Sequence, residues 1–163
     1  NAWDAPAVTK FGADGLRLGV VLVNTLPGIP MIYTGEEVAN NDTLSLFEKV
    51  GVDWKRPGEM GEIWRAMFAL RKSHPALREG AMRRVRSSEG DRVFAFVRTQ
   101  GTDRVLVVLN FGKTSRQVDL DMQGSGLAGT LRDLMGNGSF EVQQGALKLD
   151  FGPRGWVLLA GAP

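Results

Sequence analysis

The second half of the chain consists of short apolar runs separated by turn signals, and this pattern restricts its fold more than any other feature. Apolar and polar side chains alternate along residues 117–121 and 147–151. Residues 105–109 are apolar on both faces, which is typical of a central strand. Such runs, with glycine, proline and asparagine between them, predict an antiparallel β-sandwich or small barrel of about eight strands. The expected strands lie near residues 82–87, 92–99, 105–111, 116–121, 129–134, 140–143, 147–151 and 155–159.

The beginning of the chain shows a helical pattern instead. Residues 1–13 are polar and rich in turn formers, so we expect a loop there. A helix is expected from about residue 15 to residue 25, with Asp14 as its N-cap and Pro27 stopping it. Because this helix is apolar on nearly all sides, it should be buried.

A second helix is expected over residues 59–73, because its apolar side chains recur with helical spacing. Pro75 disfavours helical geometry in the preceding residue and should end it. The pattern places Arg65, Arg71 and Lys72 on the side away from the apolar stripe. Between the two helices, residues 36–58 read as a long loop, with one short helical turn near residues 44–49.

A short apolar segment precedes this loop, in the stretch LPGIPMIYTGEE at residues 26–37. Pro30 lacks an N–H group, so it suits the first residue of a strand or an edge. Gly35 allows the backbone to turn sharply. We therefore expect one short buried strand at about residues 29–34, ending in an acidic loop. The chain then divides near residue 78 into a βα-like part, residues 1–78, and an all-β part, residues 79–163.

Composition excludes several classes of function. The chain has 163 residues and contains no cysteine, which excludes disulfides and cysteine-based metal or nucleophile sites. The net charge of +2 is too small to imply a polyanionic partner. No apolar run is long enough to span a membrane. Periplasmic, secreted and cytoplasmic locations are all compatible with this composition.

The segment Gly28 to Glu37, GIPMIYTGEE, resembles the sequence around the eighth barrel strand of the α-amylase family of glycoside hydrolases. Residues 47–55 resemble the loop that follows this strand in some members. FALRKSHPAL, at residues 68–77, resembles the last barrel helix of the family. Asn1-Ala2-Trp3-Asp4 lies near the family's Asn-His-Asp motif and departs from it.

This resemblance implies a fold in two parts. Residues 1–78 would be a helix–strand–helix remnant of a (β/α)₈ barrel, and residues 79–163 would be the antiparallel C-terminal domain. The parent protein would cleave or transfer α-glucosidic linkages in starch-like glucans with retention of configuration. The family's nucleophilic Asp and acid/base Glu lie on earlier barrel strands, so the resemblance implies no catalytic residue here and no activity of this chain alone.

Substrate-binding candidates are Glu37, Glu36 and Trp3. Retaining hydrolysis needs two carboxylates about 5–5.5 Å apart, on either side of the bond. Glu36 and Glu37 are neighbours, and in an extended chain they point to opposite faces. Glu37 matches the family's acidic position at the strand end, but a carboxylate that accepts loop N–H bonds is equally compatible with the sequence. Glu36 also suits a solvated or paired side chain, and Trp3 suits a hydrophobic plug.

No cofactor is expected from the sequence. Asp42, Glu48 and Asp53 are too dispersed for a metal site, which needs clustered ligands. Residues 40–42 suit a polar turn better than a calcium site, so calcium would belong to the parent enzyme. The single histidine, His74, lies at a helix end before proline and is expected to be structural.

The expected partner of the parent protein is an α-glucan, with no nucleic acid and no membrane. Arg83, Arg84 and Arg86 suit a solvated strand face better than a nucleic-acid surface. One barrel strand alone has two free edges, so we expect its apolar surface to be covered, either in a homodimer through barrel-derived surfaces or by a rearranged helical part that lies against the β-domain. The alternative function is a non-catalytic carbohydrate-binding or packing β-module, which would need aromatic side chains exposed in a row.

Overall fold

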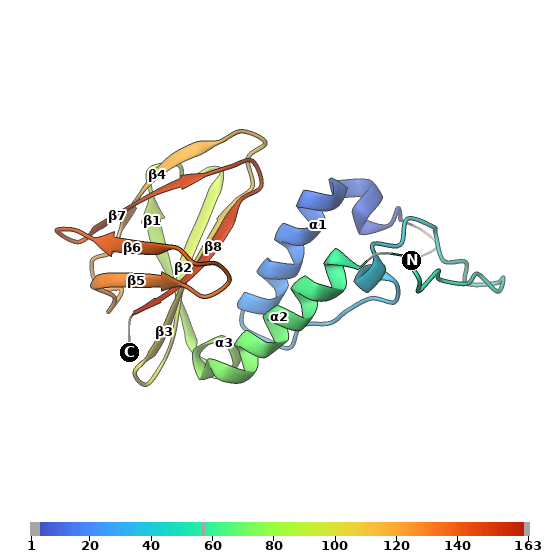
Figure 1. Cartoon of the computed structure of the whole chain (residues 1–163), viewed down its shortest axis with the longest axis horizontal. Coiled ribbons are helices and arrows are strands. Elements are labelled where there is room, and N and C mark those ends of the chain that lie inside the picture. The colour runs from blue at the N-terminus through green and yellow to red at the C-terminus, as the bar shows by residue number, and fades with distance from the viewer. Residues whose placement is uncertain (1–3, 57, 162–163) are drawn as a thin grey trace.

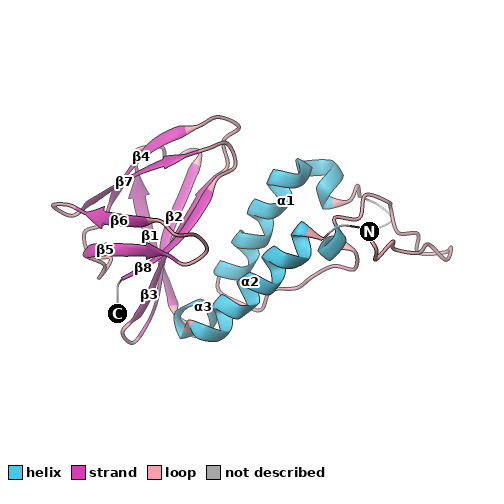
Figure 2. Ribbon diagram, in the orientation of Figure 1, coloured by secondary structure: helices cyan, strands magenta, loops and turns pink. Residues whose placement is uncertain are grey.

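The computed structural model describes residues 4–56 and 58–161, and it places helices beside a β-sheet (Figures 1 and 2). The helices are α1 (Ala7–Thr25), α2 (Glu59–Ser73) and α3 (Pro75–Glu79), with a 3₁₀ turn, η1 (Glu36–Val38). The strands are β1 (Ala81–Ser87), β2 (Val93–Gln100), β3 (Asp103–Asn110), β4 (Arg116–Asp121), β5 (Gly129–Asp133), β6 (Ser139–Val142), β7 (Ala146–Phe151) and β8 (Trp156–Gly161).

The strands form one antiparallel sheet in the order β6-β5-β8-β3-β2-β1-β4-β7. β6 and β7 stand at opposite ends of this order, yet they contact each other, so the sheet curls back and encloses a core. The eight antiparallel strands predicted from the alternation are therefore confirmed, and β4 covers the predicted residues 116–121. β3 lies between β8 and β2 and is buried on both faces, as its continuous apolar run predicts.

Alternation along β2 and β3 separates two cores. Ala95 and Leu106 face the interior of the curled sheet, together with side chains from the other strands. Phe96 and Val107 are paired across the two strands and face the helices. The helices thus share a core with the outer face of the sheet, because successive residues of a strand point to opposite sides. In Figure 1, α1 and α2 lie along this face.

The helices agree with the sequence in one case and depart from it in another. α2 covers the predicted residues 59–73. α1 begins at Ala7, so the prediction of a loop over residues 1–13 is wrong from that residue on. Asp14 is not the N-cap, because it lies inside α1, where its carboxylate accepts a bond from Arg17 Nη1 at 2.7 Å. Gly12, with φ of +72°, kinks the helix shortly before residue 15, where the sequence suggested a start.

Two smaller elements were also placed incorrectly by the sequence. Pro75 ends α2 as expected, but it also begins α3, where its missing N–H costs nothing at the first helical position. Residues 44–49 form no helical turn, and the turn of the long loop is η1, nearer its start. None of the described helices has the length and apolarity that crossing a membrane requires.

The expected strand over residues 29–34 is not formed. No strand within residues 4–56 and 58–161 pairs with this segment, and the side chains of Ile29 and Met31 are 96% and 74% exposed. A strand is stable only beside a hydrogen-bonded neighbour, and the curled sheet is already complete without this segment. The segment runs instead as an irregular connection from α1 to η1.

Candidate functional site

The loop at the end of this connection has a defined shape. Gly35 has φ of +93° and Ala39 has φ of +49°, and between them η1 forms one tight turn. The carbonyl of Gly35 accepts bonds from the N–H groups of Val38 and Asn40, at 3.2 and 2.9 Å. A Cβ at Gly35 would lie 2.9 Å from Cβ of Asn40, so glycine is required there by both conformation and space.

The turn directs both candidate carboxylates back to the loop. Glu37 Oε2 accepts the N–H of Gly35 at 3.0 Å, and Glu36 Oε2 accepts the N–H of Tyr33 at 3.3 Å. Both glutamates are half-buried. Accepting a loop N–H is the geometry of the structural alternative for Glu37, and a contact of either side chain with substrate stays a prediction. Trp3, the third candidate, lies outside the described residues.

Asn40 is the most buried polar side chain of the loop, with 8% exposure. Its Nδ2 donates to the carbonyl of Asp42 at 2.8 Å, while its Oδ1 is buried without a hydrogen-bond partner among the residues that the structure describes. Asn40 lines a small cavity of about 40 Å³, together with Tyr33 and Glu36. A cavity of this size has room for ordered water, which is the usual partner of such an oxygen.

The neighbouring polar residues form a turn. Arg56 donates to Asn41 Oδ1 at 2.6 Å and to Asp42 Oδ2 at 3.1 Å, which closes the loop across its base. Asp42 thus has a cation as its partner. Across residues 4–56 and 58–161, no three carboxylate, histidine or cysteine side chains converge as a metal site requires.

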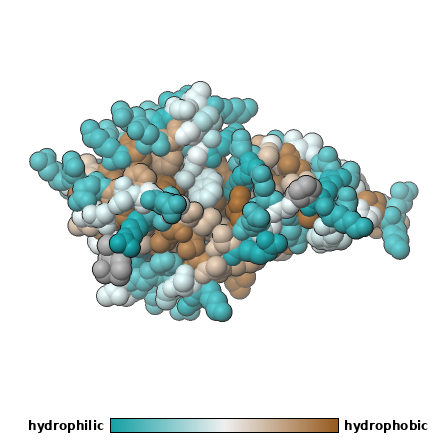
Figure 3. Space-filling view, in the orientation of Figure 1, coloured by the Kyte–Doolittle hydropathy of each residue, from teal (hydrophilic) through white to brown (hydrophobic). Residues whose placement is uncertain are grey.

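The rest of the long loop exposes apolar side chains, including some within residues 47–55. Phe47 and Trp54 are 88% and 57% exposed, and Leu46 is also exposed. The loop projects from the end of the molecule farthest from the sheet, and apolar atoms appear there among hydrophilic ones (Figures 1 and 3). In the sequence, this exposure is indicated by apolar residues in a region without helical or strand periodicity.

Two buried arginines lie where α1 ends. Arg71 Nη1 donates to the carbonyls of Asn24 and Leu77, both at 2.7 Å, and its Nη2 donates to Gly28 at 2.9 Å. Burial lowers the pKa of Arg71, and the neighbouring Arg78 cation lowers it further. Arg71 is only 9% exposed, so the expectation that it lies on the solvent side of its helix is wrong.

The second arginine comes from the sheet. Arg98 on β2 is fully buried and donates from Nε and Nη2 to the carbonyl of Gly80, at 3.2 and 2.8 Å. Its Nη1 donates to the carbonyl of Thr25 at 2.5 Å. Burial lowers the pKa of Arg98, and the Arg71 cation lowers it further. A charged residue within an apolar strand was the sequence signal for this contact.

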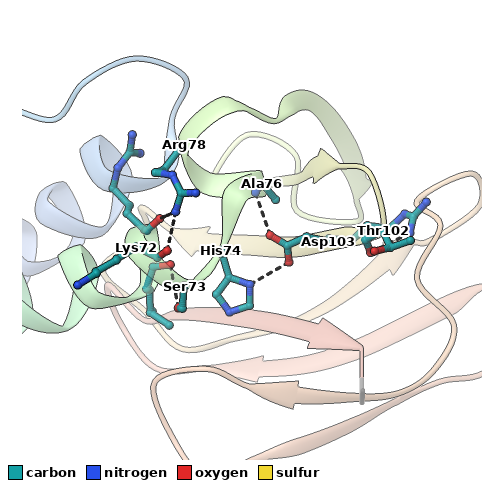
Figure 4. Close-up of polar contacts among 10 residues, drawn as sticks. Lys72, Ser73, His74, Ala76, Arg78, Thr102 and Asp103 are labelled. Carbon is teal, nitrogen blue, oxygen red and sulfur yellow. Dashed lines mark hydrogen bonds and ion pairs between the residues drawn. The ribbon is translucent and has the colours of Figure 1, made fainter.

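His74 also joins the helices to the sheet (Figure 4). Its Nδ1 lies 2.9 Å from Asp103 Oδ1, and Asp103 Oδ2 accepts the N–H of Ala76 at 2.8 Å. The carboxylate at the start of β3 therefore holds the first turn of α3. His74 lies in a structural contact, as expected for a residue at a helix end.

Comparisons with known proteins agree with this fold. The family model described as "Maltogenic Amylase, C-terminal domain" matches residues 82–158. A cyclomaltodextrin glucanotransferase of Klebsiella oxytoca is 36% identical over 115 residues, which is 64% of this chain and 17% of that protein. The alpha-amylase MalA of Haloarcula japonica is 28% identical over 144 residues, which is 83% of this chain and 21% of that protein.

Solved structures match over nearly the whole chain. A noncanonic maltogenic alpha-amylase from Thermotoga neapolitana aligns with a TM-score of 0.86 at 18% identity, covering 100% of this chain and 40% of that one. An Anoxybacillus alpha-amylase aligns with a TM-score of 0.79 at 22% identity, covering 93% and 33%. These likenesses concern the fold.

The chain is short beside these proteins, since it spans 17% and 21% of the length of the two relatives above. Its β-sheet carries the family-model match, and the helices share a core with that sheet. The comparisons therefore indicate the C-terminal part of an α-amylase family enzyme, and residues 82–158 match the model of the C-terminal domain of maltogenic amylases.

Proposed function

We propose that the chain is the C-terminal part of a glycoside hydrolase that acts on α-glucosidic linkages of starch-like glucans. In this proposal, residues 1–78 are the end of a (β/α)₈ barrel and residues 79–163 are the C-terminal β-domain. The observation that carries it is the alignment with the Thermotoga amylase, which extends over the helices and the irregular segment as well as the sheet.

The exposed segment before the acidic loop supports the barrel assignment. Ile29 and Met31 are apolar residues suited to a strand, yet they are largely exposed, and neither edge of their segment has a strand beside it among the described residues. A parallel barrel strand needs a neighbour on each edge and is buried on both faces. Neighbouring strands from the rest of an enzyme would meet both needs.

The geometry of the acidic loop favours a structural role for Glu36 and Glu37 over a catalytic one. Glu36 and Glu37 both accept N–H bonds from their own loop. Retaining hydrolysis needs one carboxylate as nucleophile and another as acid, on either side of the glycosidic bond. We therefore propose that the reacting carboxylates lie on other barrel strands, and that Glu37 shapes the floor of the substrate site.

An independent sugar-binding module has less support. Sugar platforms are aromatic rings open to solvent, but Phe96 is fully buried and Phe151 is 7% exposed. Phe111 is 39% exposed, but the described strand residues do not present a row of exposed aromatic rings beside it. Most aromatic side chains of the sheet lie in, or pack against, its two cores.

The test is release of reducing sugar from starch and from cyclomaltodextrin. The purified 163-residue chain should show no turnover, whereas the gene product that includes the coding sequence upstream of Asn1 should be active. That upstream sequence should encode apolar strands ending in an Asp and in a Glu. Turnover by the 163-residue chain itself, or an upstream sequence without such strands, would overturn the proposal.

We also propose that the isolated chain forms a homodimer. Ile29, Met31 and Phe47 leave apolar surface in water, and association between two copies would cover it. Light scattering coupled to size exclusion should give about twice the monomer mass. A monodisperse monomer at micromolar concentration would contradict dimerisation and leave the enzymatic proposal intact.

A further inference from the structure

Two buried guanidinium groups bind the backbone at the junction between the helices and the sheet. Arg98 reaches from β2 to Thr25, the last residue of α1, and Arg71 reaches from α2 to Asn24 and Gly28. The bonds from Arg98 to Thr25 and from Arg71 to Gly28 connect residues 73 and 43 positions apart in the chain. One arginine from each part of the fold thus holds the same short stretch of backbone.

The bonding partners of these arginines are unusual for buried cations. Every acceptor that the structure shows for Arg71 and Arg98 is a backbone carbonyl, and neither side chain forms an ion pair within residues 4–56 and 58–161. The carbonyls at the end of α1 carry the negative end of the helix dipole, which partly compensates the two charges. Burying like charges close together remains costly, and an apolar pair would fill the space without that cost.

The location of the bonds indicates what the arginines provide. Thr25 and Gly28 flank Leu26 and Pro27, the link through which α1 continues into the exposed segment. That segment has no sheet hydrogen bonds of its own to hold its direction. A guanidinium has five donors in a rigid plane, so it fixes the directions of several carbonyls at once.

We propose that Arg98 and Arg71 are positioning residues through which the β-domain sets the course of residues 28–37, and hence the location of the Glu37 loop. This proposal rests on the proposed function, in which residues 28–37 become the last barrel strand. The β-domain would then do more than cover the helices, because Arg98 extends from its sheet to the backbone that precedes this strand.

The only tyrosine of the chain provides a local probe. Tyr33 lies within the exposed segment and its side chain is 43% exposed. Biosynthetic labelling with 3-fluorotyrosine therefore gives a single ¹⁹F NMR resonance, which reports on this segment and not on the sheet. Far-UV circular dichroism of the same samples reports on the sheet and the helices.

The test compares variants of the full 163-residue chain. Arg98→Met keeps the length of the side chain and removes its donors, and it should shift or broaden the ¹⁹F resonance while the circular dichroism spectrum is retained. Arg98→Lys keeps the charge, but an ammonium group cannot bond two carbonyls in one plane. The resonance of this variant should therefore lie between those of the unmodified chain and Arg98→Met. Arg86→Met, on the exposed face of β1, is the matched control and should leave the resonance unchanged.

Arg71→Met is the second variant, because it removes the bond to Gly28 without changing the sheet, and it should move the same resonance. Amide exchange of residues 26–40 should accelerate by about tenfold or more in both variants, relative to the strands. An unchanged resonance in both variants would overturn the proposal, and so would loss of the whole fold in both. Because no substrate is involved, the result is independent of the starch assay.

Discussion

Phe96→Ala is the change that best tests the core shared by helices and sheet. Phe96 lies on β2, is fully buried, and faces the helices with Val107 of β3 beside it. Its ring centroid lies 5.0 Å from that of Phe94, at an interplanar angle of 42°. Alanine would leave a cavity where the two parts of the fold meet.

The expected loss follows from burial. Replacing a buried phenylalanine by alanine costs about 3–5 kcal/mol, from the lost transfer free energy and the cavity together. Protein domains have a free energy of unfolding of about 5–15 kcal/mol, so this loss is a large fraction of the total. In a domain of this size, about 1 kcal/mol lowers Tm by roughly 2–4 °C, so Tm should fall by about 6–20 °C.

The assay is urea unfolding followed by far-UV circular dichroism, with the free energy of unfolding taken from linear extrapolation. Phe111→Ala is the matched control, because that ring is 39% exposed and its removal should cost less than about 1.5 kcal/mol. If Phe96→Ala cost no more than Phe111→Ala, the helices and the sheet would not share a core in solution, and the description of the junction would be refuted.

Two further changes test the junction itself. Gly80→Ala should lower the free energy of unfolding by about 2–4 kcal/mol, because the new Cβ would collide with the carbonyl oxygen of Ala76. Gly90→Ala is the control and should be near neutral in the same urea titration, because the nearest atom to its new Cβ would be 3.6 Å away. Asp103→Ala should cost about 1–3 kcal/mol, since it removes both oxygens that contact His74 Nδ1 and the N–H of Ala76. An unchanged urea midpoint would show that this bridge does not stabilise the chain.

The sheet was predictable because strand formation depends on a local pattern. In residues 117–121, each polar side chain alternates with an apolar one, and glycine-containing turns lie on both sides of the run. Residues 105–109 predict a central strand because every side chain is apolar. α2 was equally accessible, since helical spacing and Pro75 mark its extent without reference to any distant residue.

The candidate site was only partly predictable. The sequence identified Glu36 and Glu37 at the end of an apolar segment, and it left open whether their carboxylates face a substrate or their own loop. The positive φ angles of Gly35 and Ala39 curl the loop until its N–H groups meet both carboxylates, and a contact of either carboxylate with substrate stays a prediction. Asn40 became visible only once the fold had buried it.

The amino-acid sequence by itself determined the eight strands, the second helix and the resemblance to the α-amylase family. Tertiary structure alone decided that residues 29–33 stay outside the sheet and that Arg71 and Arg98 are buried. Alternation and helical spacing are properties of neighbouring residues, so they can be read along the chain. A strand needs a partner and a buried cation needs acceptors, and both come from residues far away in the sequence.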